Sequence, residues 1–484
     1  MKLVTIFYYI TCFLALMGPV LSDYTLLALG DPGQIDQFES NGKLEKADPK
    51  GPLTMKNFEE VLENDIKGNK YVCKANSVVV LGDMVYTEGG NKNFKTGGEF
   101  ESKFDGFKER LKRGWETFQN VIKSFSTKCP ANLNNPLSKL NKNNKYTNLN
   151  LLAGNHLYDV DYQKESLFMS QMVANFGNYW ESTPPKKTNE RPMTANDIFL
   201  SPRMETQVDV TFLDINLLPV NCYLGTKLVP PVEYSNCSAV KSYPTFPTDK
   251  QAKELTDKFI QALKDMANEK TAWRVLRLHH PFFNVEGSFQ NMENVWKIKI
   301  SGEDSILTLA QKAKIGIVLA SHHHSAQLMG IPYKSADYPP MPSKINGVKD
   351  LSCYHNTDLI DQGTVNICDD NAVDEKKRTI EIKINDNNPK FMWTLVIGNS
   401  GRKNDPVWDD KNMPASLIFA RNEFGGANLV FTKNSVKATY FATIKKKQMN
   451  TLIVNFTKNE KDDYPKISKL NWINKRSSKR IMKK

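Results

Sequence analysis

The sequence predicts an α/β fold, in which a β-sheet is layered with helices. Short apolar runs of strand length alternate along the chain with segments whose apolar residues recur at helical spacing. Several of the apolar runs end in Asp, Asn or His, and ligands in such folds bind beyond the carboxyl ends of the strands. We therefore expect the polar residues at these strand ends to form one site.

The predicted elements follow one another in a regular order. Strands are expected at residues 24–29 and 77–81, before Gly154, up to Asp214, before His279, before His322, and at 392–397. Amphipathic helices are expected from Phe104 to Ile122 and from Leu255 to Met266. Alternating residues between 415 and 442 predict antiparallel strands, residues 180–205 are expected to be irregular, and residues 331–388 form a long polar insertion.

Histidine is rare in the chain and unevenly placed. Six of the seven histidines follow short apolar runs, and only His355, in the insertion, stands apart. The same pattern occurs twice without histidine, where apolar runs lead into Gly30-Asp31 and Gly82-Asp83. The chain is thus expected to bring five strand ends to one point.

The charge is basic, with a formal excess of +12. Part of this excess lies in Lys445–Lys447 and in the last ten residues, where we predict a solvated basic tail. Weak affinity for acidic surfaces is the alternative interpretation of that tail. The sequence has no basic stripe interleaved with aromatic residues, so it does not predict specific nucleic-acid binding.

The first 22 residues resemble a secretory signal. Lys2 precedes an apolar core, and Val20-Leu21-Ser22 form a small-residue cleavage site. An uncleaved membrane anchor is the alternative, but Pro19 and the short apolar core argue against it because a span needs roughly 20 apolar residues. No later segment is expected to cross a bilayer. We therefore expect a protein that is secreted or lies in a lysosomal or vacuolar lumen.

The cysteines agree with an oxidising compartment. Cys12 leaves with the signal, and six cysteines remain, so disulfides are expected. We favour Cys222 with Cys237 and Cys353 with Cys368, because each pair closes a short loop. Asn236 and Asn455 begin sequences that can accept glycans.

The strand ends together offer two Asp, one Tyr, one Asn and up to six His. Mixed imidazole and oxygen donors suit first-row transition metals. More than four donors favour two ions, and two ions roughly 3.5–4 Å apart can clamp the attacking and leaving oxygens of an in-line displacement. The sequence shows neither a nucleophile elbow with Ser or Cys nor a Gly-rich phosphate-binding loop.

Five blocks in order carry a resemblance to a known family. They are Gly30-Asp31-Pro32-Gly33, Gly82-Asp83-Met84-Val85-Tyr86, Gly154-Asn155-His156, Leu276-Arg277-Leu278-His279 and His322-His323-His324. Together they resemble the five motifs of the metallophosphoesterase superfamily. Tyr86, three residues after Asp83, points to the purple acid phosphatases, in particular the short, tartrate-resistant kind.

This resemblance runs from about residue 24 to residue 442 and implies a fold and a domain division. The implied fold is a four-layer sandwich, with two mixed β-sheets flanked by helices. The implied division is a signal peptide at 1–22, a catalytic domain at 23–445 and a basic C-terminal extension at 446–484.

The family's metal ligands can be carried over position by position. The resemblance gives one ion Asp31, Asp83, Tyr86 and His324, and gives the other Asp83 as a bridge, then Asn155, His279 and His322. A phenol with a pKa near 10 must lose its proton to bind, so Tyr86 calls for a strongly acidic ion such as Fe(III). The second ion is expected to be divalent Fe, Zn or Mn.

The resemblance gives one further role, to His156, which in the resembling family contacts the substrate phosphate and assists the leaving group. A histidine that only orients a neighbour is the alternative. This sequence departs from the family nearby, because Leu157 replaces the usual Asp or Glu, and a carboxylate there would raise the basicity of the imidazole. Met84 and Ser321 replace the usual Asn and Gly, and Ser288 stands where the family has a further histidine. His280 and His323 are expected to alternate away from the ligands and to pack or to support a ligand.

We predict an acid phosphatase that hydrolyses phosphate monoesters by attack of a metal-bound hydroxide at a binuclear centre. One alternative is a phosphatase fold kept as a secreted or membrane-associated scaffold, as in some relatives in gliding parasites. The other is a phosphodiesterase or nucleotidase that uses the same site. The sequence leaves the natural substrate and the oligomeric state open.

Overall fold

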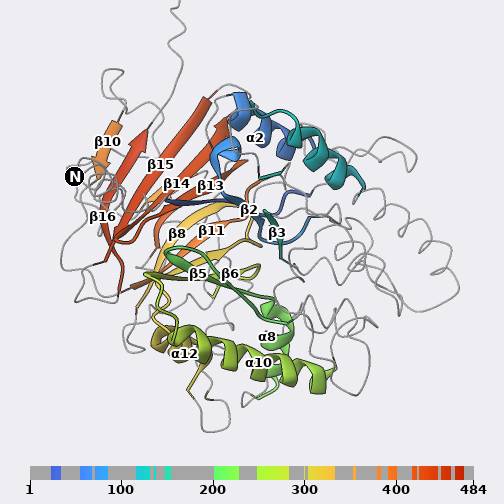
Figure 1. Ribbon diagram of the computed structural model, residues 1–484, viewed down its shortest axis with the longest axis vertical. Coiled ribbons are helices and arrows are strands. Elements are labelled where there is room, and N and C mark those ends of the chain that lie inside the picture. Colours follow the sequence, from blue (N-terminus) through green and yellow to red (C-terminus); the bar gives the residue numbers. More distant parts are fainter. Residues whose placement is uncertain are drawn as a thin grey trace, which may run out of the picture.

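The structure is a computed structural model. It describes residues 23–33, 55–67, 71–84, 116–130, 136–137, 148–152, 154, 201–227, 248–282, 299, 304–332, 353–355, 379–382, 391–400, 417–421, 424–444, 448–458 and 464–473. Two mixed β-sheets, each of eight strands, pack face to face with helices on their outer sides (Figure 1). The predicted α/β class, with two mixed sheets flanked by helices, is confirmed.

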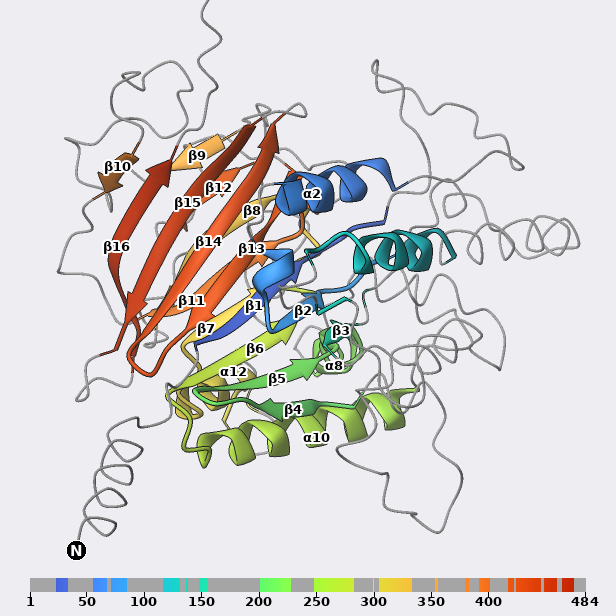
Figure 2. The ribbon, with the colours of Figure 1, turned by 45° about the horizontal axis from the view of Figure 1, so that its top comes forward.

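The first sheet has the strand order β10-β16-β15-β14-β13-β1-β2-β3 and is coloured mainly red and blue in Figure 2. Its strands β1, β2 and β3 are parallel to one another, and the remaining neighbours pair antiparallel. The strands are β1 (Tyr24–Leu29), β2 (Ser77–Val80), β3 (Leu149–Leu151), β10 (Thr379–Ile382), β13 (Phe424–Phe431), β14 (Ser435–Ile444), β15 (Gln448–Thr457) and β16 (Lys466–Ile473).

The second sheet has the order β4-β5-β6-β7-β11-β8-β12-β9. Strands β5, β6, β7 and β11 are parallel, and the strands at both sides of this group pair antiparallel. The strands are β4 (Arg203–Thr206), β5 (Val210–Ile215), β6 (Trp273–Leu278), β7 (Ile317–Ala320), β8 (Ala326–Pro332), β9 (Cys353–His355), β11 (Phe391–Ile397) and β12 (Leu417–Arg421).

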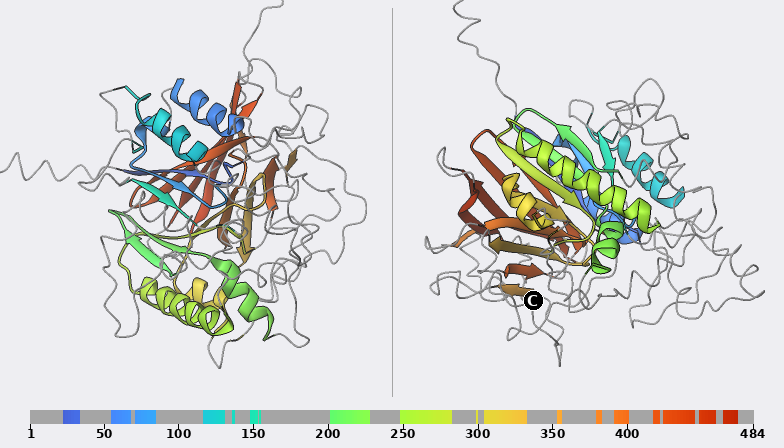
Figure 3. Two further views of the ribbon diagram at one scale, coloured as in Figure 1. Left: turned by 90° about the vertical axis from the view of Figure 1, so that its right-hand side faces the viewer. Right: turned by 90° about the horizontal axis from the view of Figure 1, so that it is seen from below.

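Helices cover the outer side of each sheet (Figure 3). Helix α2 (Lys56–Lys67) and the helical residues 116–126 lie on the first sheet, and Phe58 stacks on Phe118 with ring centroids 6.0 Å apart. Helices α8 (Leu217–Gly225), α10 (Asp249–Ala267) and α12 (Ile306–Lys312) lie on the second sheet. Thr248 and Gln251 form a capping box that starts α10.

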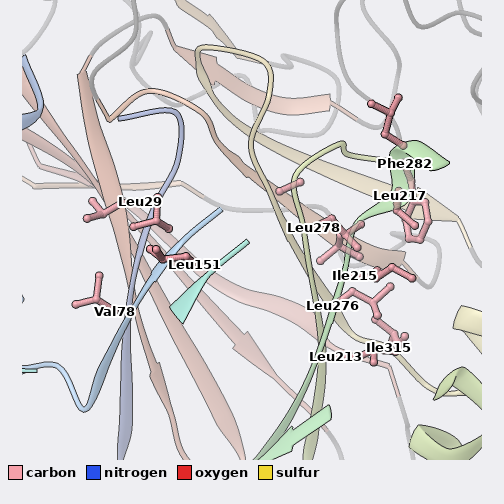
Figure 4. Packing of buried hydrophobic residues seen from close by; sticks show 14 of the residues in the cluster. Leu29, Val78, Leu151, Leu213, Ile215, Leu217, Leu276, Leu278, Phe282 and Ile315 are labelled. Atoms are coloured by element: carbon pink, nitrogen blue, oxygen red, sulfur yellow. The ribbon is translucent and has the colours of Figure 1, made fainter. Parts of the chain in front are cut away.

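Alternation along the strands divides the core into two clusters. Leu26 and Ala28 face the core between the two sheets, whereas Leu27 and Leu29 face the helices on the first sheet. On the second sheet, Leu276 and Leu278 face the helices, and Figure 4 shows them apart from Leu29, Val78 and Leu151 of the first sheet. The strands that run through the middle of the sandwich are buried on both faces, which explains their continuous apolar sequences.

Most predicted elements are confirmed. Strands occupy residues 24–29 and 77–80, and others end one to three residues before Gly154, His279 and His322. The predicted helix from Leu255 to Met266 lies within α10, with its apolar residues buried. The helix predicted from Phe104 to Ile122 is confirmed from residue 116 onward, and its earlier part lies outside the described residues.

Strands also form where the sequence analysis expected none. Strand β4 lies in the stretch predicted to be irregular, and β9 and β10 lie in the long insertion. The strands β15 and β16 lie within residues 446–484 and pair into the first sheet. Leu452, Val454 and Phe456 of β15 point into the core between the sheets at every second position. The polar residues around them in the sequence make this alternation hard to detect.

One disulfide links Cys73, in the short 3₁₀ turn η1 (Val72–Lys74), with Cys129, just beyond the helical residues 116–126. The sequence analysis had given neither cysteine a partner. Cys222 is also disulfide-bonded, and its predicted partner, Cys237, lies outside the described residues, as does Cys368. Within the described part of the chain, no helix combines the length and the apolar content that crossing a bilayer requires.

Candidate metal centre

The candidate site lies where the carboxyl ends of the parallel strands of both sheets come together. Asp31 and Asp83 follow β1 and β2 of the first sheet. His279 follows β6 of the second sheet, and His322 and His324 follow β7. Five predicted ligands therefore come from four strands in two sheets.

Asp83 and His279 join the two sheets at this point. His279 Nε2 lies 3.1 Å from Asp83 Oδ2, and both side chains are almost fully buried. His279 Nδ1 lies 2.9 Å from the carbonyl oxygen of Leu81, which can only accept a hydrogen bond. Nδ1 therefore carries a hydrogen, and Nε2 is the ring nitrogen that faces the carboxylate and can bind a metal ion once it is unprotonated.

Ser321 supports the same imidazole. Its Oγ lies 2.9 Å from His279 Nδ1 and donates to the Leu81 carbonyl oxygen at 2.7 Å. The resembling family has Gly at this position, and the sequence analysis assigned Ser321 no role. The hydroxyl helps to hold the His279 ring in one orientation, which is how residues behind a metal ligand support it.

The charge around His279 sets its pKa. Burial lowers the pKa of this imidazole, but the charge and hydrogen bond of Asp83, together with the charge of Asp31, outweigh burial, so its pKa is raised. Two buried carboxylates thus attract positive charge to this point. A bound cation would supply that charge and release the proton.

Asp31 is held from the second sheet. The main-chain N–H of His322 donates to Asp31 Oδ2 at 2.8 Å, and His324 Nε2 lies 3.7 Å from Asp31 Oδ1. The Asp31 side chain is fully buried, whereas that of His324 is 13% exposed. The two carboxylate oxygens are thus oriented separately, one toward the main chain and one toward an imidazole.

The backbone is strained at three of these ligands. Asp31, Asp83 and His322 have φ values of 51°, 46° and 67°, in the left-handed region that residues other than glycine rarely enter. Among the described residues, Lys314 is the only other non-glycine residue with positive φ. Such strain persists where the surrounding structure holds it, and it gathers at functional sites.

Two glycines of the sequence blocks leave room for the ligands. A Cβ on Gly82, whose φ is 115°, would lie 2.3 Å from His279 Nδ1. A Cβ on Gly154 would lie 1.9 Å from Asp83 Oδ1. Both distances are far shorter than real contacts, so the close approach of backbone to ligand requires glycine at both positions.

A buried serine, Ser400, forms hydrogen bonds with the backbone next to Asp31. Ser400 Oγ accepts from the Gly30 N–H at 3.0 Å and donates to the Gly425 carbonyl oxygen at 2.8 Å. The Ser400 N–H donates to the Gly30 carbonyl oxygen at 2.9 Å. These bonds tie the turn after β11 to the end of β1, directly before Asp31. No role was predicted for Ser400 from the sequence.

The two histidines expected to alternate away behave differently. His323 is buried with Nδ1 2.8 Å from Ser325 Oγ and 2.9 Å from Gln327 Nε2, away from the carboxylates as predicted. His280 instead packs against His279 and His322, with ring centroids 4.8 and 4.3 Å away. The side chain of His280 does not alternate away from the ligands, because β6 ends at Leu278 and strand alternation no longer governs the next two residues; its packing against the two rings agrees with the predicted packing or supporting role.

Two groups of donor atoms in the described residues have a spacing that fits a metal ion. The donor atoms of Asp31, Asp83 and His279 lie within 4.8 Å of one another, as do those of His279, His280 and His322. Buried carboxylates that lie this close repel each other unless cations offset their charge. The donor set therefore fits one or more metal ions. Tyr86, Asn155 and His156, also predicted for the site, lie outside the described residues.

Comparison with known proteins bears on the fold alone. No protein-family model and no curated protein sequence matches the chain. A purple acid phosphatase from yellow lupin (Lupinus luteus) seeds is similar, with a TM-score of 0.41 and 13% identity over 88% of this chain and 52% of that chain. This chain thus spans about half the length of the lupin chain.

Two further solved structures are similar to this chain, with comparable TM-scores. GAP50, described as the anchor in the inner membrane complex of Plasmodium, has a TM-score of 0.39 and 10% identity, over 92% of this chain and 91% of its own. PhoD has a TM-score of 0.43 and 9% identity, over 94% of this chain and 72% of its own. The chain is an α/β sandwich of two mixed sheets with a candidate Asp/His metal centre.

Proposed function

We propose that the protein is a binuclear metallohydrolase that hydrolyses phosphate monoesters, with the activity of an acid phosphatase. The observation that carries this proposal is the buried group formed by Asp31, Asp83 and His279, whose donor atoms lie within 4.8 Å of one another. These residues come from three strands in two sheets. Local packing of one element cannot bring them together, so their convergence supports a common function.

Distances within the site support a proposed division of the ligands between two ions. Asp31 Oδ1 faces His324 Nε2 at 3.7 Å, and both were predicted for the first ion. Asp83 Oδ2 and His322 Nδ1 lie 3.1 and 3.2 Å from His279 Nε2, and these three were predicted for the second ion. Asp83 also belongs to the group with Asp31, which suits a carboxylate that bridges both ions.

Two cations in this pocket would supply Lewis acidity, which lowers the pKa of water and offsets the charge of a phosphate ester. The chain's own residues position that chemistry. The hydrogen bonds to Leu81 and Ser321 fix the tautomer of His279, and the N–H of His322 fixes the Asp31 carboxylate. Because these groups are already oriented before substrate binds, little reorganisation is needed during the reaction.

Tyr86 and His156 complete the proposal. Tyr86 as a phenolate would call for Fe(III) at the first ion, beside a divalent Fe, Zn or Mn ion at the second. Two aspartates and one phenolate carry three negative charges, fewer than the five positive charges of such a pair, so the centre would attract an anionic phosphate. His156 is proposed to protonate the departing alcohol or phenol, and a secretory signal at 1–22 would direct the protein to an oxidising compartment.

The direct test measures metal content, colour and activity on the same purified protein. We expect bound iron, visible absorption from Tyr86 and hydrolysis of an aryl monophosphate that exceeds hydrolysis of the matching diester. Asp83→Ala should abolish turnover, and the matched control Asp257→Ala, at a side chain 53% exposed on α10, should not.

Three results would change the proposal. Full activity in Asp83→Ala would overturn it. Faster turnover of the diester would replace it with a phosphodiesterase that uses the same residues. A colourless and inactive protein that binds no metal would leave the fold without catalysis and favour a scaffold function.

A further inference from the structure

The turn after β6 carries two adjacent histidines, and both point toward the candidate centre. Because β6 ends at Leu278, His279 and His280 lie in a bend rather than on opposite faces of a strand. His280 is 1% exposed. The bend therefore places a second imidazole at the same point as a predicted ligand.

The three rings of His279, His280 and His322 form a compact group. Their centroids are separated by 4.8 Å between His279 and His280, 4.3 Å between His280 and His322, and 5.1 Å between His279 and His322. One nitrogen from each ring lies within 4.8 Å of the others. Two of the three residues are buried and His322 is partly buried, so an ion among them would be largely enclosed.

The spacing of two of these nitrogens already matches a shared ion. Zinc–nitrogen bonds of about 2.0–2.1 Å at a tetrahedral angle separate two ligand nitrogens by roughly 3.3 Å. His322 Nδ1 and His279 Nε2 lie 3.2 Å apart. The His280 ring packs against both rings, and one of its nitrogens lies within 4.8 Å of theirs, so a third nitrogen lies near the same ion.

We propose that His280 is a further metal ligand, which joins His279 and His322 around the second cation. This inference rests on the proposed function, because it concerns one of the two ions of that centre. A neutral imidazole adds a donor without adding charge. Three imidazoles favour ions such as Zn²⁺ or Co²⁺ over Mn²⁺, which prefers oxygen ligands. The second ion would thus be zinc-like, with fewer positions open to water.

His323 provides a matched control. It is also buried and also directly follows a predicted ligand, but its Nδ1 faces Ser325 Oγ and Gln327 Nε2. Replacing it removes a buried imidazole of the same size without removing a proposed ligand. A change seen in both variants would therefore report packing rather than coordination.

The first experiment titrates metal-free protein with Zn²⁺ and with Co²⁺. Wild type should bind two ions. His280→Ala should bind the second ion more than about 100-fold more weakly, beyond the 10–100-fold typical of residues that only support a ligand. The Co²⁺ absorption spectrum should change in the same variant, and His323→Ala should keep the wild-type affinity and spectrum.

The second experiment needs no variant, so it remains decisive if His280→Ala fails to fold. In zinc-loaded crystals of wild type, the anomalous peak at the second ion should lie about 2.1 Å from a ring nitrogen of His280. A peak between His279 and His322 that leaves His280 beyond bonding distance would overturn this inference and leave the phosphatase proposal standing. Wild-type protein that binds no ion would overturn both.

Discussion

The main-chain N–H of His322 donates to Asp31 Oδ2 at 2.8 Å, which joins the end of β7 in one sheet to the end of β1 in the other. Both residues have positive φ, so the bond forms between two strained turns. Each residue is also a predicted ligand, of a different ion. The distance between the two halves of the centre is therefore set partly by this one hydrogen bond.

Asp31→Asn removes the negative charge of this side chain but keeps an oxygen that can accept the hydrogen bond. The amide oxygen can still accept from His322, so the fold should persist, but the loss of negative charge should weaken the first ion. We expect the variant to keep one of the two metals, to show little visible colour, and to lose about 100- to 1,000-fold in turnover, the size of effect that removing one catalytic electrostatic contact has. Metal analysis and aryl phosphate kinetics measure this, with Asp257→Asn on the surface as control. Two bound metals and unchanged colour would contradict the assignment of Asp31.

Gly82→Ala should damage the site through its backbone. The new Cβ would lie 2.3 Å from His279 Nδ1, at a φ of 115°. We expect a loss of roughly 1–3 kcal/mol in the free energy of unfolding and weaker binding of the second ion. Gly316→Ala is the matched control, because its nearest neighbour would be the Pro465 side chain at 3.0 Å. Denaturant unfolding and zinc titration would show the contrast, and equal effects in both variants would rule out a special role for Gly82.

Ser400→Ala tests the hydrogen bond between Ser400 and Gly30, the residue before Asp31. The variant leaves the buried Gly30 N–H without its bond to Ser400 Oγ, which should cost about 1–3 kcal/mol of stability. Because Ser400 binds no proposed metal, both ions should still bind after folding. Urea unfolding and metal analysis measure the two effects, and Ser126→Ala at an exposed hydrogen bond is the control. A variant as stable as wild type would show that Ser400 is dispensable.

Glu205→Gln tests a buried ion network between the sheets. Arg277 Nη2 donates to Glu205 Oε2 at 2.8 Å, and Arg277 also pairs with Asp214. Burial raises the pKa of Glu205, but the charges of Arg277 and Arg203 outweigh it, so its pKa is lowered.

A lowered pKa in the folded state means that Glu205 stabilises the protein above its unfolded pKa of about 4.3. That contribution is lost as the pH falls through the folded pKa. The free energy of unfolding of wild type should therefore exceed that of Glu205→Gln by about 1–3 kcal/mol near pH 7. This difference should shrink below about pH 4. Urea unfolding of metal-free protein across this range measures it, with the exposed Glu254→Gln as control. A difference that does not depend on pH would contradict the charge argument.

Much of the fold was predictable because its strands are buried on both faces and carry distinctive apolar runs. The runs before Asp31, Asp83, His279 and His322 show this, and the ligands follow from their position at the ends. The strands β15 and β16 were not predicted, because their alternation lies among Lys, Asn and Thr residues. Their place in the sheet depends on tertiary pairing, since β15 pairs with β14 and β16 pairs with β15. The partner of Cys73 was likewise undetermined, since Cys129 reaches it only through the packing of a helix on the first sheet.

The sequence by itself determined which residues lie at strand ends and which donor types are offered there, because these depend on local periodicity and on residue chemistry. Only the tertiary structure decided that Asp31 and Asp83 from one sheet face His279, His322 and His324 from the other. It also decided that His280 lies with them. The physical reason is that side-chain direction beyond the last residue of a strand is set by the bend and by contacts across the two sheets, and neither leaves a period in the sequence.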